Sequence, residues 1–302
     1  MDARREWDAG RPVDLASTLG PLRRGGGDPA HRRDGDGWFW RACHTPDGPG
    51  TLALRTAGAV VSARAWGGGA GWLLDRLPTL LGADDDWSAL DVTAVPALER
   101  ARRVRPGLRL PNTGLVLDAL VPAVLEQRVT GQEARRAWAG LLRRYGEPAP
   151  GPRADLRVPP SPRGLLDVPT WGWHRLGVDL ARQRAIRAAA TVAPRLEECV
   201  GLAPDAALAR LRVVPGVGVW TAAETAQRAL GHPDAVSVGD YHLPNSVVHF
   251  FTGRPRGTDE EMLELLAPWA GQRQRVMRLI ELAGGAAPRF GPRFAYTDIR
   301  AI

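Results

Sequence analysis

Residues 211–222, LRVVPGVGVWTA, form a segment in which two glycines separate two stretches of helical character. Glycine lets the backbone turn tightly, and its missing Cβ allows the N–H groups of the turn to approach a ligand closely. These N–H groups would lie at the N-terminus of the second helix, where the helix dipole favours an anion such as a phosphate. A plain turn between two helices has the same pattern. Gly216 and Gly218 therefore predict either a phosphate-binding turn or a structural one.

A single carboxylate, Asp240, lies further along the chain, after the mostly apolar stretch 235–238. Pro244 belongs near the start of the helix that follows, because proline is tolerated only in the first turn. An ionised carboxylate in this place could stabilise positive charge that develops in a transition state and could orient a water molecule. The alternative is structural, since an aspartate that caps a helix stabilises it by about 0.5–2 kcal/mol.

The charged residues include 40 arginines and no lysine, which excludes a lysine Schiff base, a phosphate-loop lysine and a lysine acid or base. With 33 acidic residues the formal net charge is +7, which favours an anionic partner, although a generic basic surface would give the same sum. Two cysteines, Cys43 and Cys199, are too few for a disulfide framework, a zinc site or a four-cysteine iron–sulfur cluster. With no signal peptide and no membrane-spanning apolar run, we expect a cytoplasmic protein without a membrane partner.

The first part of the chain is predicted to form strands. Residues 38–43, 51–56 and 60–66 are short and rich in aromatic and β-branched residues, and turn-forming residues separate them. We expect a three-stranded meander, and after the glycine run that begins at Gly67 we expect a helix over 72–81.

The spacing of the apolar residues changes to a helical period from about residue 106. Residues 117–125 would bury one face of a helix, and a capping box of Thr130 and Glu133 begins the next one. Further helices are predicted over 179–195, 204–211 and 269–283, with N-caps at Ser161 and Thr258 for two others and a Pro-rich loop over 147–162. The sequence therefore predicts a mainly α protein with an N-terminal α+β domain.

Together, the glycine hairpin and the carboxylate resemble the helix-hairpin-helix DNA glycosylase superfamily, in which a Pro-Gly-Val-Gly hairpin precedes a catalytic aspartate. The closest likeness is to the bacterial 3-methyladenine DNA glycosylase II type. Residues 105–111, RPGLRLP, are similar to the beginning of that family's helical domain, and residues 120–134, with LEQRVT at 125–130, are similar to its DNA-wedging helix and turn. The likeness implies an N-terminal domain over 1–104, a helical domain over 105–283 with an active-site cleft between two lobes, and a tail over 284–302.

The resemblance also implies roles for the residues that match. The amides of Gly216, Gly218 and Thr221 would bind a DNA phosphate. The carbonyls of Arg212, Val214 and Val217 would ligate a structural monovalent cation, Na⁺ or K⁺. Trp220 would form a wall of the base pocket, with Asp240 at its floor and Glu224 and Tyr241 at its border. Gln127 and Arg128 would contact DNA at the wedging turn. Arg128 stands where well-known relatives have leucine, and the alternative is an ordinary exposed arginine.

The implied activity is that of a monofunctional DNA N-glycosylase. Such an enzyme flips a damaged base, here an alkylated purine, out of double-stranded DNA and hydrolyses its N-glycosidic bond, which initiates base excision repair. Members that also cut the backbone carry a lysine where Trp220 stands. No cofactor is required for the hydrolysis, and no iron–sulfur cluster is expected. The alternative is a non-catalytic helix-hairpin-helix protein that binds DNA or senses damage. We expect a monomer associated with a bacterial nucleoid.

Two departures from the family pattern leave the lesion open. The last helix lacks a second pocket tryptophan, and position 224 is Glu224 where the best-known relative has an aromatic residue. Glu224 lies one helical turn past Trp220 and could attract a cationic purine or donate a proton to a neutral one. The alternative is a capping box with Thr221. Trp171 and Trp173, with His174, could supply the missing stacking, and the favoured alternative is a role in the core or at an interface. His242 and His249 are expected to pack or to lie on the surface.

Overall fold

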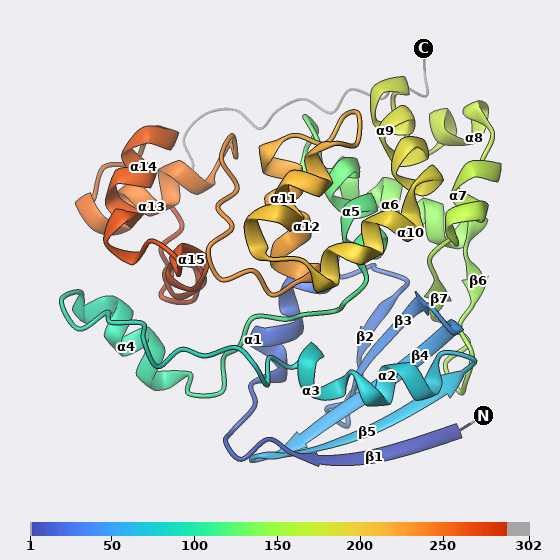
Figure 1. The fold of residues 1–302 in the computed structure, drawn as a ribbon, viewed down its shortest axis with the longest axis horizontal. Helices are drawn as coiled ribbons and strands as arrows, with labels where there is room; N and C mark the ends of the chain where they lie inside the picture. The colour runs from blue at the N-terminus through green and yellow to red at the C-terminus, as the bar shows by residue number, and fades with distance from the viewer. Residues whose placement is uncertain (1, 289–302) are drawn as a thin grey trace.

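The computed structural model of the chain describes residues 2–288 and has a sheet at one end with two groups of helices beside it (Figure 1). The predicted fold class, mainly α with an N-terminal α+β part, is confirmed. Of the predicted tail over 284–302, residues 289–302 lie outside the described residues. Among the described helices, none has the length and hydropathy that a membrane span requires.

The N-terminal sheet has five antiparallel strands in the order β1-β5-β4-β3-β2. The predicted meander is confirmed as β3 (Phe39–Thr45), β4 (Gly48–Ala57) and β5 (Val60–Gly67). The prediction missed both outer strands, β1 (Asp2–Asp8) and β2 (His31–Arg33). These edge strands are short or rich in charge, and so lack the apolar alternation by which a strand is recognised.

Short helices pack against the sheet and complete the N-terminal core, which includes Leu52, Leu54 and Leu77. They are α1 (Leu15–Leu19), the 3-10 helix η1 (Gly20–Leu22), α2 (Ala70–Asp75) and α3 (Leu77–Leu80). The prediction of one helix over 72–81 is wrong, because the chain leaves helical geometry at Arg76 and Pro78 lies in the first turn of a new helix.

The larger group of helices, which we call the hairpin lobe, shares one core that includes Leu120, Trp138 and Ile186. Its helices are α5 (Val116–Leu125), α6 (Gly131–Tyr145), α7 (Pro162–Asp167), α8 (Thr170–Arg175), α9 (Leu180–Thr191), α10 (Ala193–Glu197), η2 (Glu198–Gly201), α11 (Pro204–Arg212) and α12 (Val219–Ala229). The predicted capping box at Thr130 and the N-cap at Ser161 are confirmed.

Two predictions for this lobe are corrected. The segment 147–162 contains a small strand pair, β6 (Glu147–Pro148) and β7 (Arg157–Val158), and is not wholly a loop. The helix expected over 179–195 ends at Thr191, because Pro194 lies in the first turn of a separate helix that begins at Ala193.

The smaller group, the C-terminal lobe, combines α4 (Pro96–Val104) with α13 (Leu243–Thr252), α14 (Asp259–Leu266), η3 (Ala267–Trp269) and α15 (Arg273–Leu282). Its core unites residues far apart in sequence, among them Leu98, Val247 and Ile280. The capping box at Thr258 is confirmed, whereas the last helix begins at Arg273 and not at Trp269. The domain limits at 104 and 283 remain predictions.

Candidate active site

The glycine hairpin joins α11 to α12 in the hairpin lobe (Figure 1). Leu211, Val214 and Val217 are buried, so the turn rests on the core of the lobe. Gly216 has a φ of +86°, in the left-handed region that favours glycine, and a Cβ there would lie 2.7 Å from the Cβ of Ala185. The turn itself therefore requires glycine at position 216.

Helix α12 begins directly after the hairpin, with Gly218 as its N-cap. Glycine has no side chain that could accept hydrogen bonds from the amides of the first turn, so these N–H groups are left for another acceptor. A Cβ on Gly218 would meet no heavy atom within 4 Å, and its φ is −90°. The folded chain does not need glycine at 218, whereas a ligand pressed against this backbone would.

Gln127, which was expected to contact DNA, braces the hairpin. Its Nε2 donates to the carbonyl of Gly216 at 2.9 Å and to Oγ1 of Thr221 at 2.8 Å. The turn between α5 and α6 is thereby held against the start of α12. The structure thus brings together three of the predicted DNA-binding residues, and their contact with DNA remains a prediction.

Arg128 is exposed in the same turn. Within residues 2–288 it is the one non-glycine residue with a positive φ, at 54°. A left-handed backbone costs a residue that has a Cβ about 1–2 kcal/mol, and glycine or asparagine is the usual occupant. Strain of this kind is often found at functional sites, which favours a specific role for the Arg128 side chain over that of an ordinary surface arginine.

Asp240 lies in the loop between α12 and α13, which leads from the hairpin lobe to the C-terminal lobe. Its Oδ1 accepts from the backbone amides of His242 at 2.7 Å and Leu243 at 2.8 Å, as a helix cap does. Its Oδ2 accepts from the indole Nε1 of Trp220 at 3.0 Å. All three partners are donors, which suits an ionised carboxylate. Asp240 therefore caps α13, as the structural alternative predicts, and it also contacts Trp220, the predicted wall of the base pocket.

Two contacts tie this loop to the C-terminal lobe. Asp234 forms a two-pronged ion pair with Arg273 at the start of α15, and the amide of Gly239 donates to Oδ2 of Asp259 at 3.0 Å. Burial alone would raise the pKa of Asp234, but the hydrogen bonds from Arg273 lower it on balance. The pair therefore stays charged at neutral pH and anchors the beginning of the loop.

Glu224 is a paired, largely buried carboxylate on α12, with 13% of its side chain exposed. Its Oε2 accepts from Nη1 of Arg228 at 2.7 Å, and its Oε1 accepts from Oγ of Ser237 at 2.5 Å. The capping-box alternative is wrong, because α12 begins after Gly218 and Thr221 lies inside the helix. The role of Glu224 at the border of a base pocket remains a prediction.

The other candidate residues are spread more widely. Tyr241 is next to Asp240, 70% exposed, with its ring edge-on to His242. Trp173 is fully buried in the core of the hairpin lobe, as expected, whereas Trp171 is exposed on α8. The carbonyl of Val214, one of the three expected cation ligands, accepts a hydrogen bond from the amide of Val217 at 3.0 Å.

Sequence reasoning missed the polar partners that hold the loop of Asp240, chiefly Arg228, Ser237 and the Asp234–Arg273 pair. The spacing of Glu224 and Arg228, one helical turn apart, was an available signal for an ion pair. Nothing comparable in the sequence pattern marks Ser237 or the pairing of Asp234 with Arg273, since these contacts join separate elements.

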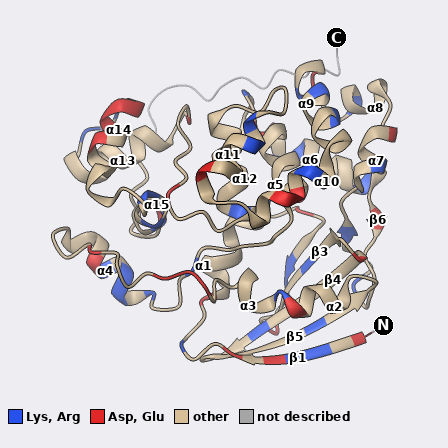
Figure 2. Cartoon of the chain, viewed as in Figure 1, with Lys and Arg blue, Asp and Glu red and all other residues tan. Residues whose placement is uncertain are grey.

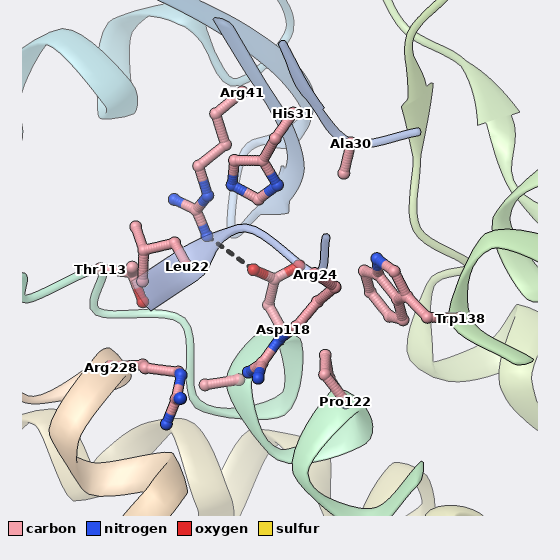
Figure 3. Close-up of a pocket in the computed structure, with 11 residues that line it drawn as sticks. Leu22, Arg24, Ala30, His31, Arg41, Thr113, Asp118, Pro122, Trp138 and Arg228 are labelled. Atoms are coloured by element: carbon pink, nitrogen blue, oxygen red, sulfur yellow. Dashed lines mark hydrogen bonds and ion pairs between the residues drawn. The ribbon is translucent and has the colours of Figure 1, made fainter. Parts of the chain in front are cut away.

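Two cavities in the described part of the chain lie beside the N-terminal sheet and do not reach Asp240. The smaller, of about 20 Å³, is lined by side chains from the sheet, α5 and α12, including Arg41, Asp118 and Arg228 (Figure 3). The larger has a volume of about 200 Å³ and an apolar floor that includes Phe39 and Leu54. Trp220 and Asp240 are half-buried and line neither, so the enclosed base pocket remains a prediction.

Arginines lie on both lobes, on α6, α9 and α11 of the hairpin lobe and on α4 and α15 of the C-terminal lobe (Figure 2). The first turn of α14 in the C-terminal lobe consists of three acidic residues. An anionic partner is therefore attracted to the hairpin lobe in preference to the start of α14.

Comparison with known proteins finds relatives that repair DNA. The chain is 34% identical over 173 residues to the probable bifunctional transcriptional activator/DNA repair enzyme AlkA of Mycobacterium tuberculosis, a match that covers 56% of the chain and 34% of that protein. It is 28% identical over 179 residues to DNA-3-methyladenine glycosylase 2 of Escherichia coli, covering 57% of the chain and 60% of that protein. The chain thus spans between about a third and three fifths of the length of these curated relatives. No protein-family model matches it.

Among solved structures, MBOgg1 in complex with a low-affinity DNA ligand superimposes with a TM-score of 0.73 at 14% sequence identity. The superposition covers 94% of the chain and 98% of MBOgg1. At this identity the likeness establishes a shared fold, which extends over the sheet and both helical lobes.

Proposed function

We propose that this chain is a member of the helix-hairpin-helix DNA glycosylase superfamily, similar to its 3-methyladenine glycosylase II type, and that it acts as a monofunctional DNA N-glycosylase. It removes an alkylated purine from double-stranded DNA and so initiates base excision repair. The observation that carries this proposal is the contact of Trp220 with Asp240 at 3.0 Å, because a hairpin that only binds DNA needs no such carboxylate. The names of the relatives, which are those of repair enzymes, support catalysis over the non-catalytic alternative.

In this proposal the hairpin binds the DNA backbone, and the turn that carries Gln127 and Arg128 assists base flipping. The amides of Gly216, Gly218 and Thr221 hold a phosphate at the N-terminus of α12. Because Gln127 hydrogen-bonds to Gly216, the turn that carries Arg128 lies against the same segment. A base can react only after it leaves the stack, which costs a few kcal/mol, and the Arg128 guanidinium fills the space by stacking between the remaining bases.

The chemistry requires one ionised carboxylate and a water molecule. An N-alkylated purine already carries a positive charge, so it leaves as a neutral base when the bond to C1′ breaks. Asp240 stabilises the positive charge that forms on the sugar and orients the water that attacks C1′, and the proton of that water passes to solvent. Glu224 accepts hydrogen bonds from Arg228 and Ser237, so we assign it no role as a proton donor and favour cationic lesions as substrates.

We further propose that a monovalent cation binds at the hairpin, held by the carbonyls of Arg212, Val214 and Val217. The Val214 carbonyl accepts one hydrogen bond and keeps a second lone pair, so the oxygen donor set fits such an ion. A bound cation would add positive charge beside the phosphate, and catalysis itself requires no cofactor.

A panel of lesion-bearing duplexes tests the activity. We expect release of cationic bases, such as 7-methylguanine and 3-methyladenine, at higher rates than neutral ones, such as hypoxanthine or 8-oxoguanine, with released bases quantified by mass spectrometry. Because the chain has no lysine, the product strand should stay intact until it is treated with alkali. Absence of any released base would refute the proposed activity, and a borohydride-trapped covalent adduct with DNA would refute the monofunctional mechanism.

Arg128 is expected to act in flipping. Arg128→Ala should weaken binding to lesion DNA and slow flipping, measured with 2-aminopurine fluorescence next to the lesion, and should reduce the salt dependence of binding if Arg128 contacts a phosphate. Arg128→Gly is the matched control, because glycine relieves the backbone at φ 54° but also lacks the side chain. If Arg128→Gly flipped the base as fast as wild type does, Arg128 would have no wedging role.

A further inference from the structure

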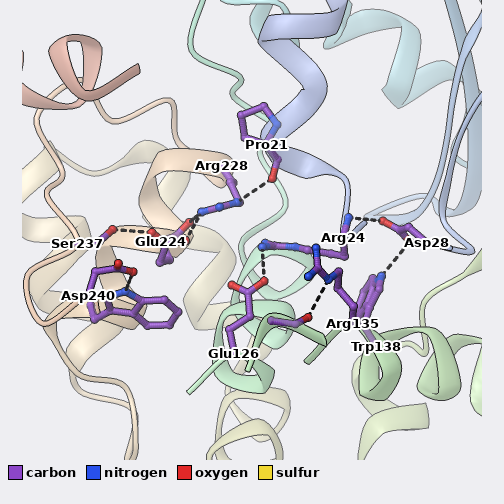
Figure 4. A network of polar contacts seen from close by, with 12 residues as sticks. Pro21, Arg24, Asp28, Glu126, Arg135, Trp138, Glu224, Arg228, Ser237 and Asp240 are labelled. Carbon is purple, nitrogen blue, oxygen red and sulfur yellow. Dashed lines mark hydrogen bonds and ion pairs between the residues drawn. The ribbon is translucent and has the colours of Figure 1, made fainter. Parts of the chain in front are cut away.

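A continuous series of polar contacts runs from the N-terminal region to the loop that carries Asp240 (Figure 4). The carbonyl of Pro21, in η1, accepts from Nε of Arg228 at 3.0 Å. Nη1 of Arg228 donates to Glu224 at 2.7 Å, and Glu224 accepts from Oγ of Ser237 at 2.5 Å. The carbonyl of Ser237 in turn accepts from the amide of Asp240 at 3.2 Å. Four consecutive hydrogen bonds therefore link η1 to the candidate catalytic residue.

A second branch begins just after Pro21 and ends at the turn between α5 and α6 (Figure 4). Nη1 of Arg24 donates to Oε1 of Glu126 at 3.0 Å. Glu126 directly precedes Gln127, which braces the hairpin, and Arg128, the proposed wedge. The short segment 21–24 is therefore connected to both parts of the site, although these parts are far apart in sequence.

Both arginines of the network are largely buried, with 7% of the Arg24 side chain and 14% of the Arg228 side chain exposed. Burial and the neighbouring Arg228 lower the pKa of Arg24. Burial likewise opposes the charge of Arg228, but Glu224 and Glu126 raise its pKa overall. Removing the carboxylate partner of either buried arginine would leave an uncompensated buried charge, so the pairs with Glu126 and Glu224 hold the two arginines in place.

We propose that segment 21–24 is a positioning element of the active site, which fixes the loop of Asp240 through Arg228 and the turn of Arg128 through Arg24. The inference rests on the proposed glycosylase activity. The wedge, Arg128, and the carboxylate of Asp240 must act on the same nucleotide. Their relative position therefore has to be maintained while the base is extruded. The N-terminal region thereby takes part in catalysis without contacting the reacting atoms.

Arg228→Met tests the first branch, because methionine keeps much of the side-chain length but leaves Glu224 and the Pro21 carbonyl without this partner. The single-turnover excision rate is expected to fall by about 10²-fold, the effect of a displacement of about 1 Å at a catalytic group, while affinity for an abasic duplex changes only a few-fold. Arg228→Lys, which retains a cation beside Glu224, is expected to recover part of the rate.

Arg41→Met is the matched control. Nη2 of Arg41, on β3, pairs with Asp118 on α5 at 2.6 Å, and the arginine side chain is 9% exposed (Figure 3). This ion pair also joins the N-terminal region to the hairpin lobe, and the hydrogen bond of Arg41 goes to Asp118 and not to the loop of Asp240. Arg41→Met should therefore lower the unfolding temperature to a similar degree and leave the excision rate within a few-fold of wild type.

Hydrogen exchange of the free protein separates this inference from the activity. Amides of residues 237–243 are expected to exchange faster in Arg228→Met than in wild type or Arg41→Met. If wild type excised no base but Arg228→Met still showed this faster exchange, the proposed function would fail and the positioning role would stand. Equal excision rates in Arg228→Met and Arg41→Met, or unchanged exchange of the loop in Arg228→Met, would overturn the inference.

Discussion

Asp240→Asn is expected to abolish base excision while DNA binding is retained. Asparagine keeps the shape of the side chain but loses the charge that stabilises the developing positive charge on the sugar, and removal of such an electrostatic group costs at least ~10²–10³-fold in rate. Single-turnover excision on a duplex with a cationic lesion measures the loss. Affinity for an abasic duplex, measured in parallel, should stay within a few-fold of wild type.

The hydrogen bonds of Asp240 define the control for this variant. In Asp240→Asn the amide oxygen can still accept from the backbone of His242 and Leu243, but its NH₂ group faces the indole N–H of Trp220. The loss of one hydrogen bond should lower the free energy of unfolding by only about 1 kcal/mol. Trp220→Phe removes the same hydrogen bond and keeps the charge, so its excision rate should fall far less. Full activity in the asparagine variant would remove Asp240 from the mechanism.

Gly216→Ala is expected to disrupt the hairpin and with it DNA binding. Alanine at a φ of +86° is strained, and its Cβ would lie 2.7 Å from the Cβ of Ala185. The backbone strain and the overpacking together should lower the free energy of unfolding by roughly 2–4 kcal/mol. Thermal unfolding and titration of a lesion duplex at fixed salt concentration measure the two effects, and both should be large.

Gly218→Ala isolates the effect of the ligand. Its φ of −90° suits alanine and the added Cβ meets no heavy atom within 4 Å, so the stability cost is limited to the poorer capping by alanine, about 1 kcal/mol. DNA affinity should nevertheless fall by about tenfold, equivalent to about 1.4 kcal/mol, because the Cβ would stand between the backbone and the phosphate. Unchanged affinity would show that the turn is structural.

Local patterns in the sequence predicted much of the fold. Capping boxes at Thr130 and Thr258 and the N-cap at Ser161 identified helix starts correctly, because each depends on residues a few positions apart. The β3–β5 meander was predictable from its tight turns. The charged edge strand β1 was missed, since its place is set by pairing with β5 and not by its own residue types.

For the active site, too, local sequence patterns identified some residues, whereas others depend on contacts between separate elements. The glycine hairpin and Asp240 were identified from residue type, spacing and family resemblance, and the structure shows Asp240 in contact with Trp220. The residues that hold the loop of Asp240 were not predictable, because Arg228 and Ser237 acquire their partners only when η1, α12 and the loop meet. Gln127 was expected at the DNA interface, and its bonds to the hairpin depend on the packing of α5 against α12.

The C-terminal lobe has a consequence for how the chain folds during synthesis. Its core joins α4 to helices made after the whole hairpin lobe, so residues such as Leu98 lack their partners on α13–α15 until these helices leave the ribosome. Closing so long a loop is slow, and apolar surface exposed in the meantime favours aggregation. The loop of Asp240 is anchored at α15 through Asp234 and Arg273 and can reach its final position only after this closure. We therefore expect catalytic competence to be acquired last in folding, after the hairpin lobe is already able to hold a phosphate.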